Sequence, residues 1–218
     1  MNVLELFAGS RSIGKAAELL GYSVFSSDLY LYENINYAVD ILNFDIDKVP
    51  FKPDIIWASP PCTTFSVASL GHHWTGGKKG YIPKTENALL GIEIAKATLN
   101  IINQLQPNFW FIENPRGLLR KMPFMSLLKR HTVTYCQYGD NRMKPTDIWT
   151  NSNLWQPKPM CKNGDKCHIA APRGSNTGTQ GKRNAYERSK IPNELCIEIL
   201  KSCNEHSRKI TTTNRQSM

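Results

Sequence analysis

The sequence predicts one α/β domain built on a mostly parallel sheet with an antiparallel edge. In the first part of the chain, short apolar runs alternate with segments of helical periodicity, as in strands joined by helical crossovers. The last apolar runs follow one another without a long helical segment, which is typical of antiparallel strands. With 218 residues the chain is long enough to bury one substantial core.

The apolar runs end close to polar residues, and in parallel sheets that edge binds ligands. The strands that we expect span residues 3–7, 22–27, 37–41, 55–58, 109–112, 132–136 and 147–150, and the helices span 13–20, 86–106, 122–130 and 193–206.

The first unit reads as a strand, a tight turn at Gly9 and a helix. Glycine allows close backbone approach to a ligand, and a helix amino end favours an anion or a polar head group. Neither a Gly-x-Gly-x-x-Gly run nor a phosphate-loop lysine is present, so dinucleotide or ATP binding is poorly supported. Asp28, at the end of the second strand, stands where such folds hold a ribose hydroxyl pair.

Two further strand ends carry chemistry. The strand at 55–58 stops at Pro60-Pro61 and places Cys62 in the next loop, with its position restricted by the prolines. A free cysteine there is either a nucleophile or a small buried hydrophobe. Glu113 ends the strand at 109–112 and precedes Asn114-Pro115, so it is either solvated or functional.

The net charge of +9 favours polyanions, nucleic acid before anionic membrane. No apolar run is long enough to cross a bilayer, and the start does not resemble a signal peptide, so we expect a cytoplasmic protein. Six irregularly spaced cysteines do not form a disulfide framework.

Two segments read as loops. Residues 70–83 are rich in glycine; we expect a mobile lid that contacts phosphate through Lys78 and Lys79, with a solvated His72-His73 pair. Residues 151–190 are rich in proline, glycine and basic residues, including Arg183 and Arg188, and suit a phosphate backbone.

Cysteine and histidine also gather within this second loop. Cys161, Cys167 and His168 can supply three zinc ligands, with Cys136 or another group as the fourth. Their spacing is not a common zinc-finger pattern, so we expect free surface thiols and no metal.

Three motifs occur in order along the chain. Residues 4–10 are similar to Asp-Leu-Phe-Ala-Gly-x-Gly, residues 61–66 to Pro-Cys-Gln-x-Phe-Ser with Thr63 in place of glutamine, and residues 113–115 to Glu-Asn-Val. In this order and spacing they make the chain resemble the DNA (cytosine-5)-methyltransferases, in the short form common in phages and restriction-modification systems. Two later motifs depart from the family: Gln-x-Arg-x-Arg is reduced to Arg142-x-Lys144, and Gly-Asn-Ser-Val is replaced by residues 188–192.

The resemblance implies a Rossmann-like S-adenosylmethionine-dependent methyltransferase fold, with a seven-stranded sheet and helices on both faces. It divides the chain into a catalytic domain (1–150), a reduced recognition region (151–190), a helix that packs back on the domain (191–206) and a disordered tail (207–218). The implied setting is a bacterial or phage-infected cytoplasm; no oligomeric state follows.

The resemblance also implies the chemistry. Cys62 attacks C6 of a cytosine flipped out of duplex DNA, Glu113 holds N3 and the amino group, and Arg142 steadies the base. S-adenosylmethionine lies against Phe7, Ala8, Gly9, Ser10, Asp28, Leu29, Asp40, Ile41 and Pro60. DNA contacts fall to Ser66, Lys78, Lys79, Lys144, Arg183 and Arg188.

Three alternatives stay open beside this prediction. An amino-methyltransferase is disfavoured, because residues 59–62 keep the two prolines of its motif but lack the polar and aromatic groups around them. An inactive DNA-binding relative is favoured weakly by the altered Arg142 region. An RNA target remains open, because basic side chains do not distinguish the two polymers.

Overall fold

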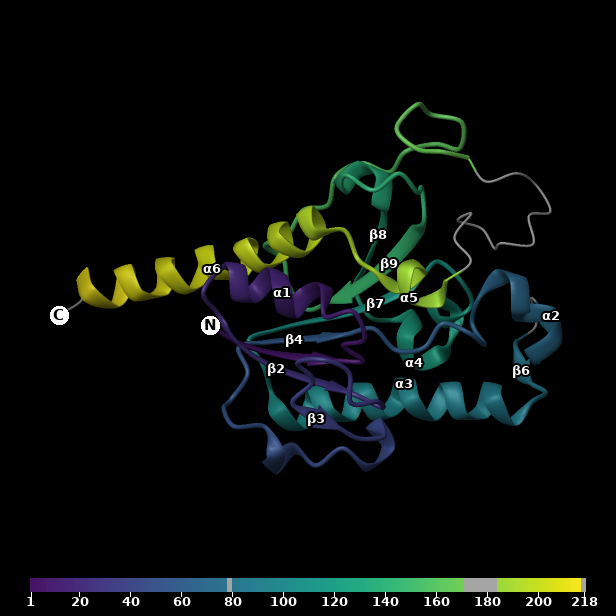
Figure 1. Ribbon diagram of the computed structural model, residues 1–218, viewed down its shortest axis with the longest axis horizontal. Helices are drawn as coiled ribbons and strands as arrows, with labels where there is room; N and C mark the ends of the chain where they lie inside the picture. The colour runs from purple at the N-terminus through teal and green to yellow at the C-terminus, as the bar shows by residue number, and fades with distance from the viewer. Residues whose placement is uncertain (78–79, 171–183, 217–218) are drawn as a thin grey trace.

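The structure is a computed structural model that describes residues 1–77, 80–170 and 184–216 (Figure 1). At its centre lies a seven-stranded sheet in the order β3-β2-β1-β4-β7-β9-β8. Its strands are β1 (Asn2–Leu6), β2 (Ser23–Asp28), β3 (Tyr37–Ala38), β4 (Ile55–Ala58), β7 (Phe109–Pro115), β8 (Arg130–Thr134) and β9 (Pro145–Thr150).

The first five strands in this order are parallel. They follow the doubly wound topology: the chain adds β2 and β3 on one side of β1, and then β4 and β7 on the other. Strand β9 enters between β7 and β8 and is antiparallel to both. The predicted Rossmann-like sheet with an antiparallel edge is therefore confirmed. Its topological switch point, where ligands bind in such folds, lies at the carboxyl ends of β1 and β4.

Helices cover both faces of the sheet (Figure 1). Helices α1 (Ser12–Leu19) and α6 (Asn193–Gln216) pack on one face, over a core that includes Val3 and Trp57, and α3 (Glu86–Leu105) packs on the other, over Leu4 and Ile56. Alternate residues of a strand point to opposite faces, so these fully apolar strands serve both cores. In α6, the residues that face α1 and the sheet are completely buried: Leu195, Cys196, Ile199, Leu200 and Cys203.

The segment predicted as a bare loop at 70–83 contains structure. It forms the short helix α2 (Leu70–His73) and a hairpin of β5 (Trp74–Thr75) and β6 (Ile82–Pro83). His73 is buried and its Nδ1 lies 2.7 Å from Thr85 Oγ1, so the prediction that both histidines are solvated is wrong for His73. Trp74 donates from Nε1 to the Thr64 carbonyl at 2.7 Å, which attaches the hairpin to the loop after Cys62.

Several boundaries also differ from the prediction; the strand predicted at 132–136, for example, spans 130–134. The strand at 37–41 is shortened, because the Asp40 side chain accepts from Leu42 N at 3.0 Å and starts a 3₁₀ turn, Ile41–Asn43. The helix expected at 122–130 shrinks to α4 (Pro123–Ser126), because β8 begins at Arg130. The backbone of α6 stays helical to Gln216, through a tail expected to be disordered; no proline or glycine follows residue 192 to stop it.

The basic region before α6 holds one more short helix, α5 (Ala185–Ser189). In the part of the chain that the structure describes, no helix is both long enough and apolar enough to cross a membrane.

A buried carboxylate joins β1 to α1. Glu5 is 2% exposed and accepts hydrogen bonds from Ile13 N and Ser26 Oγ, both at 3.0 Å. Burial raises the pKa of Glu5 to about 7, against the opposing effect of these donors and of Arg11. A Cβ on Gly14 would come within 2.6 Å of Glu5 Oε2, so glycine is required there for α1 to begin this close to the strand.

Glu5 makes stability depend on pH. Its pKa is about 7 in the folded chain against an ordinary value of 4.5, so the folded state holds this proton more tightly. The stabilising contribution is complete below about pH 4.5 and is lost as pH rises through about 7, a change of at most about 3 kcal/mol in the free energy of unfolding. Chemical unfolding of wild type and Glu5→Gln across this range measures it.

The difference in the free energy of unfolding between wild type and Glu5→Gln should shrink or reverse as pH rises. Glu93→Gln, at an exposed site on α3, should leave the pH dependence of the free energy of unfolding as in wild type. A constant difference between wild type and Glu5→Gln over this pH range would contradict the role of Glu5.

Candidate active site

The side chains predicted to be catalytic lie at the ends of two neighbouring strands. Cys62 follows β4, and Glu113 lies in β7, which pairs in parallel with β4. Asn114 donates from Nδ2 to the Pro60 carbonyl at 2.8 Å and so ties the Cys62 loop to β7. Asn114 Oδ1 is buried and has no hydrogen-bond partner among the described residues, which leaves an acceptor available beside this loop.

Glu113 is buried among polar groups that hold its carboxylate in one orientation. Tyr135 donates its hydroxyl to Glu113 Oε1 at 2.9 Å. The ammonium of Lys144, also buried, lies 4.6 Å from the centre of the Tyr135 ring. Burial lowers the pKa of Lys144, and the charge of Glu113 opposes that effect. The site therefore pairs a buried carboxylate with a buried cation.

The Cys62 thiol is kept protonated by its surroundings. Burial raises its pKa above the ordinary 9.0, and the charge of Glu113 raises it further. Lys144 and Arg188 act in the opposite direction. The thiolate is the reactive form of a cysteine, so the balance between Glu113 and these cations sets the reactivity of Cys62.

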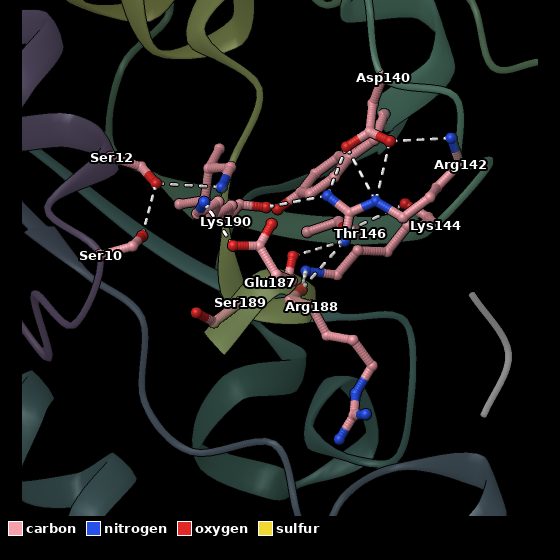
Figure 2. Close-up of polar contacts among 12 residues, drawn as sticks. Ser10, Ser12, Asp140, Arg142, Lys144, Thr146, Glu187, Arg188, Ser189 and Lys190 are labelled. Atoms are coloured by element: carbon pink, nitrogen blue, oxygen red, sulfur yellow. Dashed lines mark hydrogen bonds and ion pairs between the residues drawn. The ribbon is translucent and has the colours of Figure 1, made fainter. Parts of the chain in front are cut away.

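The structure places Arg142 in contact with a backbone segment (Figure 2). Its guanidinium binds both carboxylate oxygens of Asp140 and donates to the carbonyls of Glu187, Arg188 and Lys190 at 3.2–3.3 Å. Lys144 donates to the Arg188 carbonyl at 3.0 Å. These contacts attach α5 and the following residues to the segment that precedes β9. The direct contact of Arg142 with a base stays a prediction.

Close backbone packing holds the loop after Cys62. Leu118 N donates to the Phe65 carbonyl at 2.7 Å, and a Cβ on Gly117 would overlap that carbonyl. Ser66 accepts from Ser69 N at 3.3 Å and starts a short 3₁₀ turn. Ser66 thus shapes the loop; its contact with DNA stays a prediction.

The switch point carries the residues predicted for the cofactor. Phe7, Gly9 and Arg11 all adopt positive φ, at 57°, 44° and 54°, which folds the backbone into a tight turn. The Asp28 carboxylate accepts hydrogen bonds from Gly9 N at 2.9 Å and from Tyr30 N at 3.2 Å. Beyond it the side chains of residues 29–32, Leu-Tyr-Leu-Tyr, are all at least half exposed.

A pocket of about 180 Å³ adjoins this turn. Ser12 Oγ accepts a hydrogen bond from Ile191 N at 3.1 Å and lies 2.9 Å from Ser10 Oγ (Figure 2). The start of α1 therefore contacts the segment before α6. The pocket is lined by Ser10, Ser12, Lys15, Lys190, Ile191 and Asn193. Hydroxyls and two lysines suit a carboxylate, and the exposed apolar run suits a base, so this edge fits S-adenosylmethionine. Asp40 is exposed, Ile41 is buried behind it, and Ala8 and Pro60 are buried in the turns.

Several predicted residues fall elsewhere. Lys78, Lys79 and Arg183 lie outside the described residues. Cys161 is buried, so the expectation of a surface thiol is wrong for it. The candidate ligand atoms of Cys136, Cys161, Cys167 and His168 all lie within 4.8 Å of one another.

Some residues of the site were missed by sequence reasoning. The sequence could have identified Asn114, because it follows Glu113 within a recognised motif. It could not have identified Tyr135, since a tyrosine at a strand end is common in any core. Lys15 and Lys190 are 175 positions apart in numbering, and only the docking of α6 beside α1 brings them to one pocket.

Comparison with known proteins defines the class. The family model of the C-5 cytosine-specific DNA methylases matches residues 1–128, more than half of the chain. The chain belongs to this family.

Individual relatives share less than a third of their residues with this chain. A probable DNA (cytosine-5)-methyltransferase of Frog virus 3 (isolate Goorha) is 29% identical over 220 residues, covering 93% of this chain and 100% of the relative. Among solved structures, the Dnmt2 methyltransferase of S. pombe is 13% identical, with a TM-score of 0.47 over 72% of this chain. A mutant of Spodoptera frugiperda DNMT2 is 16% identical, with a TM-score of 0.43 over 71%. The chain spans about half the length of these two structures (52% and 51%).

The reactivity of Cys62 tests the electrostatics of the site. In the native protein, its alkylation by iodoacetamide should keep rising about tenfold per pH unit past pH 9, whereas in the denatured chain it should level off near 9.0. Glu113→Gln should lower the apparent pKa and Lys144→Met should raise it. Mass spectrometry of the Cys62 peptide separates this thiol from the other five cysteines.

Thr63→Ala, an exposed neighbour, is the matched control and should leave the Cys62 profile unchanged. If Glu113→Gln and Lys144→Met shifted the pKa in the same direction, the assignment of opposing charges would be wrong.

Proposed function

We propose that this protein methylates C5 of cytosine in DNA, with Cys62 as the nucleophile. The observation that carries the proposal is the pairing of Cys62 and Glu113 at adjacent strand ends, next to a turn that fits S-adenosylmethionine. Membership of the cytosine-specific family supports cytosine as the base and DNA as the polymer. When bound, S-adenosylmethionine supplies the methyl group as an electrophile.

The roles of the side chains follow from the chemistry of the ring. Cytosine C5 is a poor nucleophile until a thiolate adds to C6, so Cys62 must lose its proton and form a bond to C6. Glu113, held by Tyr135, takes up a proton from water as the base binds, so that one oxygen donates to N3 and the other accepts from the exocyclic amino group, which offsets the charge that the ring gains. Methyl transfer leaves the cofactor as a neutral thioether; loss of the C5 proton to water and elimination of the Cys62 thiolate then restore the ring.

Substrate binding to Glu113 also removes an obstacle to this attack. In the free protein the charge of Glu113 disfavours the Cys62 thiolate, while Lys144 favours it. Once a base hydrogen-bonds the carboxylate, its charge is partly neutralised, and the effect of Lys144 dominates. We therefore assign Lys144 to stabilising the thiolate, and Arg142 to holding the segment at 187–190 that carries Arg188.

The target base must leave its helix, because Glu113 and Lys144 are buried and cannot reach a base within a duplex. The net charge of +9 gives the attraction for the phosphate backbone, to which we assign Arg188 and the predicted contacts Lys78, Lys79 and Arg183. The same charges suit RNA, and the experiment below separates the two polymers.

Transfer of labelled methyl groups from S-adenosylmethionine tests the function. We expect 5-methylcytosine in mixed-sequence duplex DNA after nuclease digestion and mass spectrometry, and at least about a hundredfold less in RNA of the same sequence. Cys62→Ala should abolish transfer while binding of S-adenosylmethionine stays within about twofold of wild type, because the cofactor edge is formed by β1 and β2.

Thr63→Ala serves as the control and should retain transfer. A preference for RNA would mean that RNA, not DNA, is the substrate. Full transfer by Cys62→Ala would show that Cys62 is not the nucleophile. Cofactor binding without transfer to either polymer would favour the inactive DNA-binding relative.

A further inference from the structure

We propose that Cys136, Cys161, Cys167 and His168 bind a structural zinc ion that fixes the recognition region to the catalytic domain. Cys136 lies in the 3₁₀ helix η6 (Tyr135–Tyr138), and the other three residues come from the loop that follows β9. The chain thus brings together residues up to 32 positions apart, through contacts that the proposed activity does not use.

The spacing of the ligand atoms agrees with a tetrahedral metal site. Cys136 Sγ lies 3.1 Å from Cys161 Sγ and 3.6 Å from Cys167 Sγ. His168 Nδ1 lies 3.8 Å from Cys161 Sγ and 3.6 Å from Cys167 Sγ. Bonds of about 2.3 Å to sulfur and about 2.0 Å to nitrogen place tetrahedral ligands roughly 3.5–3.8 Å apart. Three of these four distances fall in that range, and the Cys136–Cys161 distance is shorter.

A disulfide explains the cluster less well. It would join two sulfurs at about 2.05 Å and give no reason for a third sulfur and an imidazole to converge on the same point. All of these cysteines are free thiols in the structure. Four protein ligands, three of them sulfur, are typical of structural zinc and leave no open position for catalysis.

The surrounding chain holds the ligands in place. Cys161 N donates to Thr134 Oγ1 at 3.0 Å, which seats this ligand against the end of β8. Between Cys161 and Cys167 the chain reverses in a turn, in which Lys162 N donates to Asp165 Oδ2 at 2.7 Å and Gly164 has a φ of 96°. Gln137 Nε2 lies 3.6 Å from Cys167 Sγ, where it can donate to a thiolate.

A metal would supply the stability that this region lacks. Residues 151–170 contain no helix or strand, and from 162 to 170 all but His168 are exposed. Trp155 is the large buried side chain of the segment and packs in the main core near α6. A loop with so small a core usually needs a metal or a disulfide to hold one conformation.

The position of the cluster links it to the active site. Cys136 directly follows Tyr135, whose hydroxyl holds Glu113, and Ile169 N donates to the Asn141 carbonyl at 2.8 Å, next to Arg142. Zinc at this point would therefore fix the loop at 161–168 to the segment that carries Tyr135, Arg142 and Lys144.

Metal analysis tests the proposal without any assay of activity. The full chain, purified with a phosphine reductant and no chelator, should contain about one equivalent of zinc. Cys161→Ser and Cys167→Ser should each reduce the zinc content to less than about a quarter, whereas Cys62→Ala should keep the wild-type amount. Replacement of zinc by Co²⁺ in the wild type should give the absorption of tetrahedral cobalt bound to thiolates.

Alkylation of Cys167 covers the case in which the serine variants fail to fold. This exposed thiol should be protected in wild type and react at least about tenfold faster after a chelator is added. The proposal is overturned if the reduced wild type neither contains nor takes up zinc or cobalt, or if the serine variants keep the wild-type content. It is also overturned if non-reducing mass spectrometry finds a Cys136–Cys161 disulfide in the native protein.

Discussion

The buried carboxylate of Glu113, near the end of β7, is the constraint on which the rest of the site depends. A carboxylate such as Glu113 can be removed from water only when hydrogen bonds and a nearby cation compensate it. Tyr135 and Lys144 provide this compensation, and both come from the antiparallel edge of the sheet rather than from its parallel half. The surroundings of Glu113 are therefore complete only when β8 and β9 are in place.

That requirement explains why distant parts of the chain converge on one place. Lys144 and Arg142 hold the backbone at 187–190, and Ser12 receives Ile191 N just before α6 begins. The packing of α6 on α1 then closes the pocket beside the tight turn at Gly9. Hydrogen bonds from Arg142, Lys144 and Ser12 thus join the start of α1 and the segment before β9 to the backbone at 187–191.

The sequence predicted the sheet and the positions of Cys62 and Glu113 at neighbouring strand ends because these features have local signals. Apolar runs that end at Pro60 and at Glu113 identify both strands and their polar ends. The partners of Glu113 have no such signal, since Tyr135 and Lys144 reach it only through the pairing of β7, β9 and β8. The group of Cys136, Cys161, Cys167 and His168 is an intermediate case. The sequence shows these residues, but their convergence depends on the position of η6 beside the loop.

Covalent trapping tests the central claim, that Cys62 attacks cytosine under the control of Glu113. Duplex DNA that contains 5-fluorocytosine, incubated with the protein and S-adenosylmethionine, cannot lose fluorine as it would lose a proton, so the adduct should persist. The account predicts a shifted band in denaturing electrophoresis for wild type, none for Cys62→Ser, and slower formation for Glu113→Gln. A shifted band of wild-type intensity with Cys62→Ser would contradict it, as would no band from wild type that binds both the cofactor and the DNA.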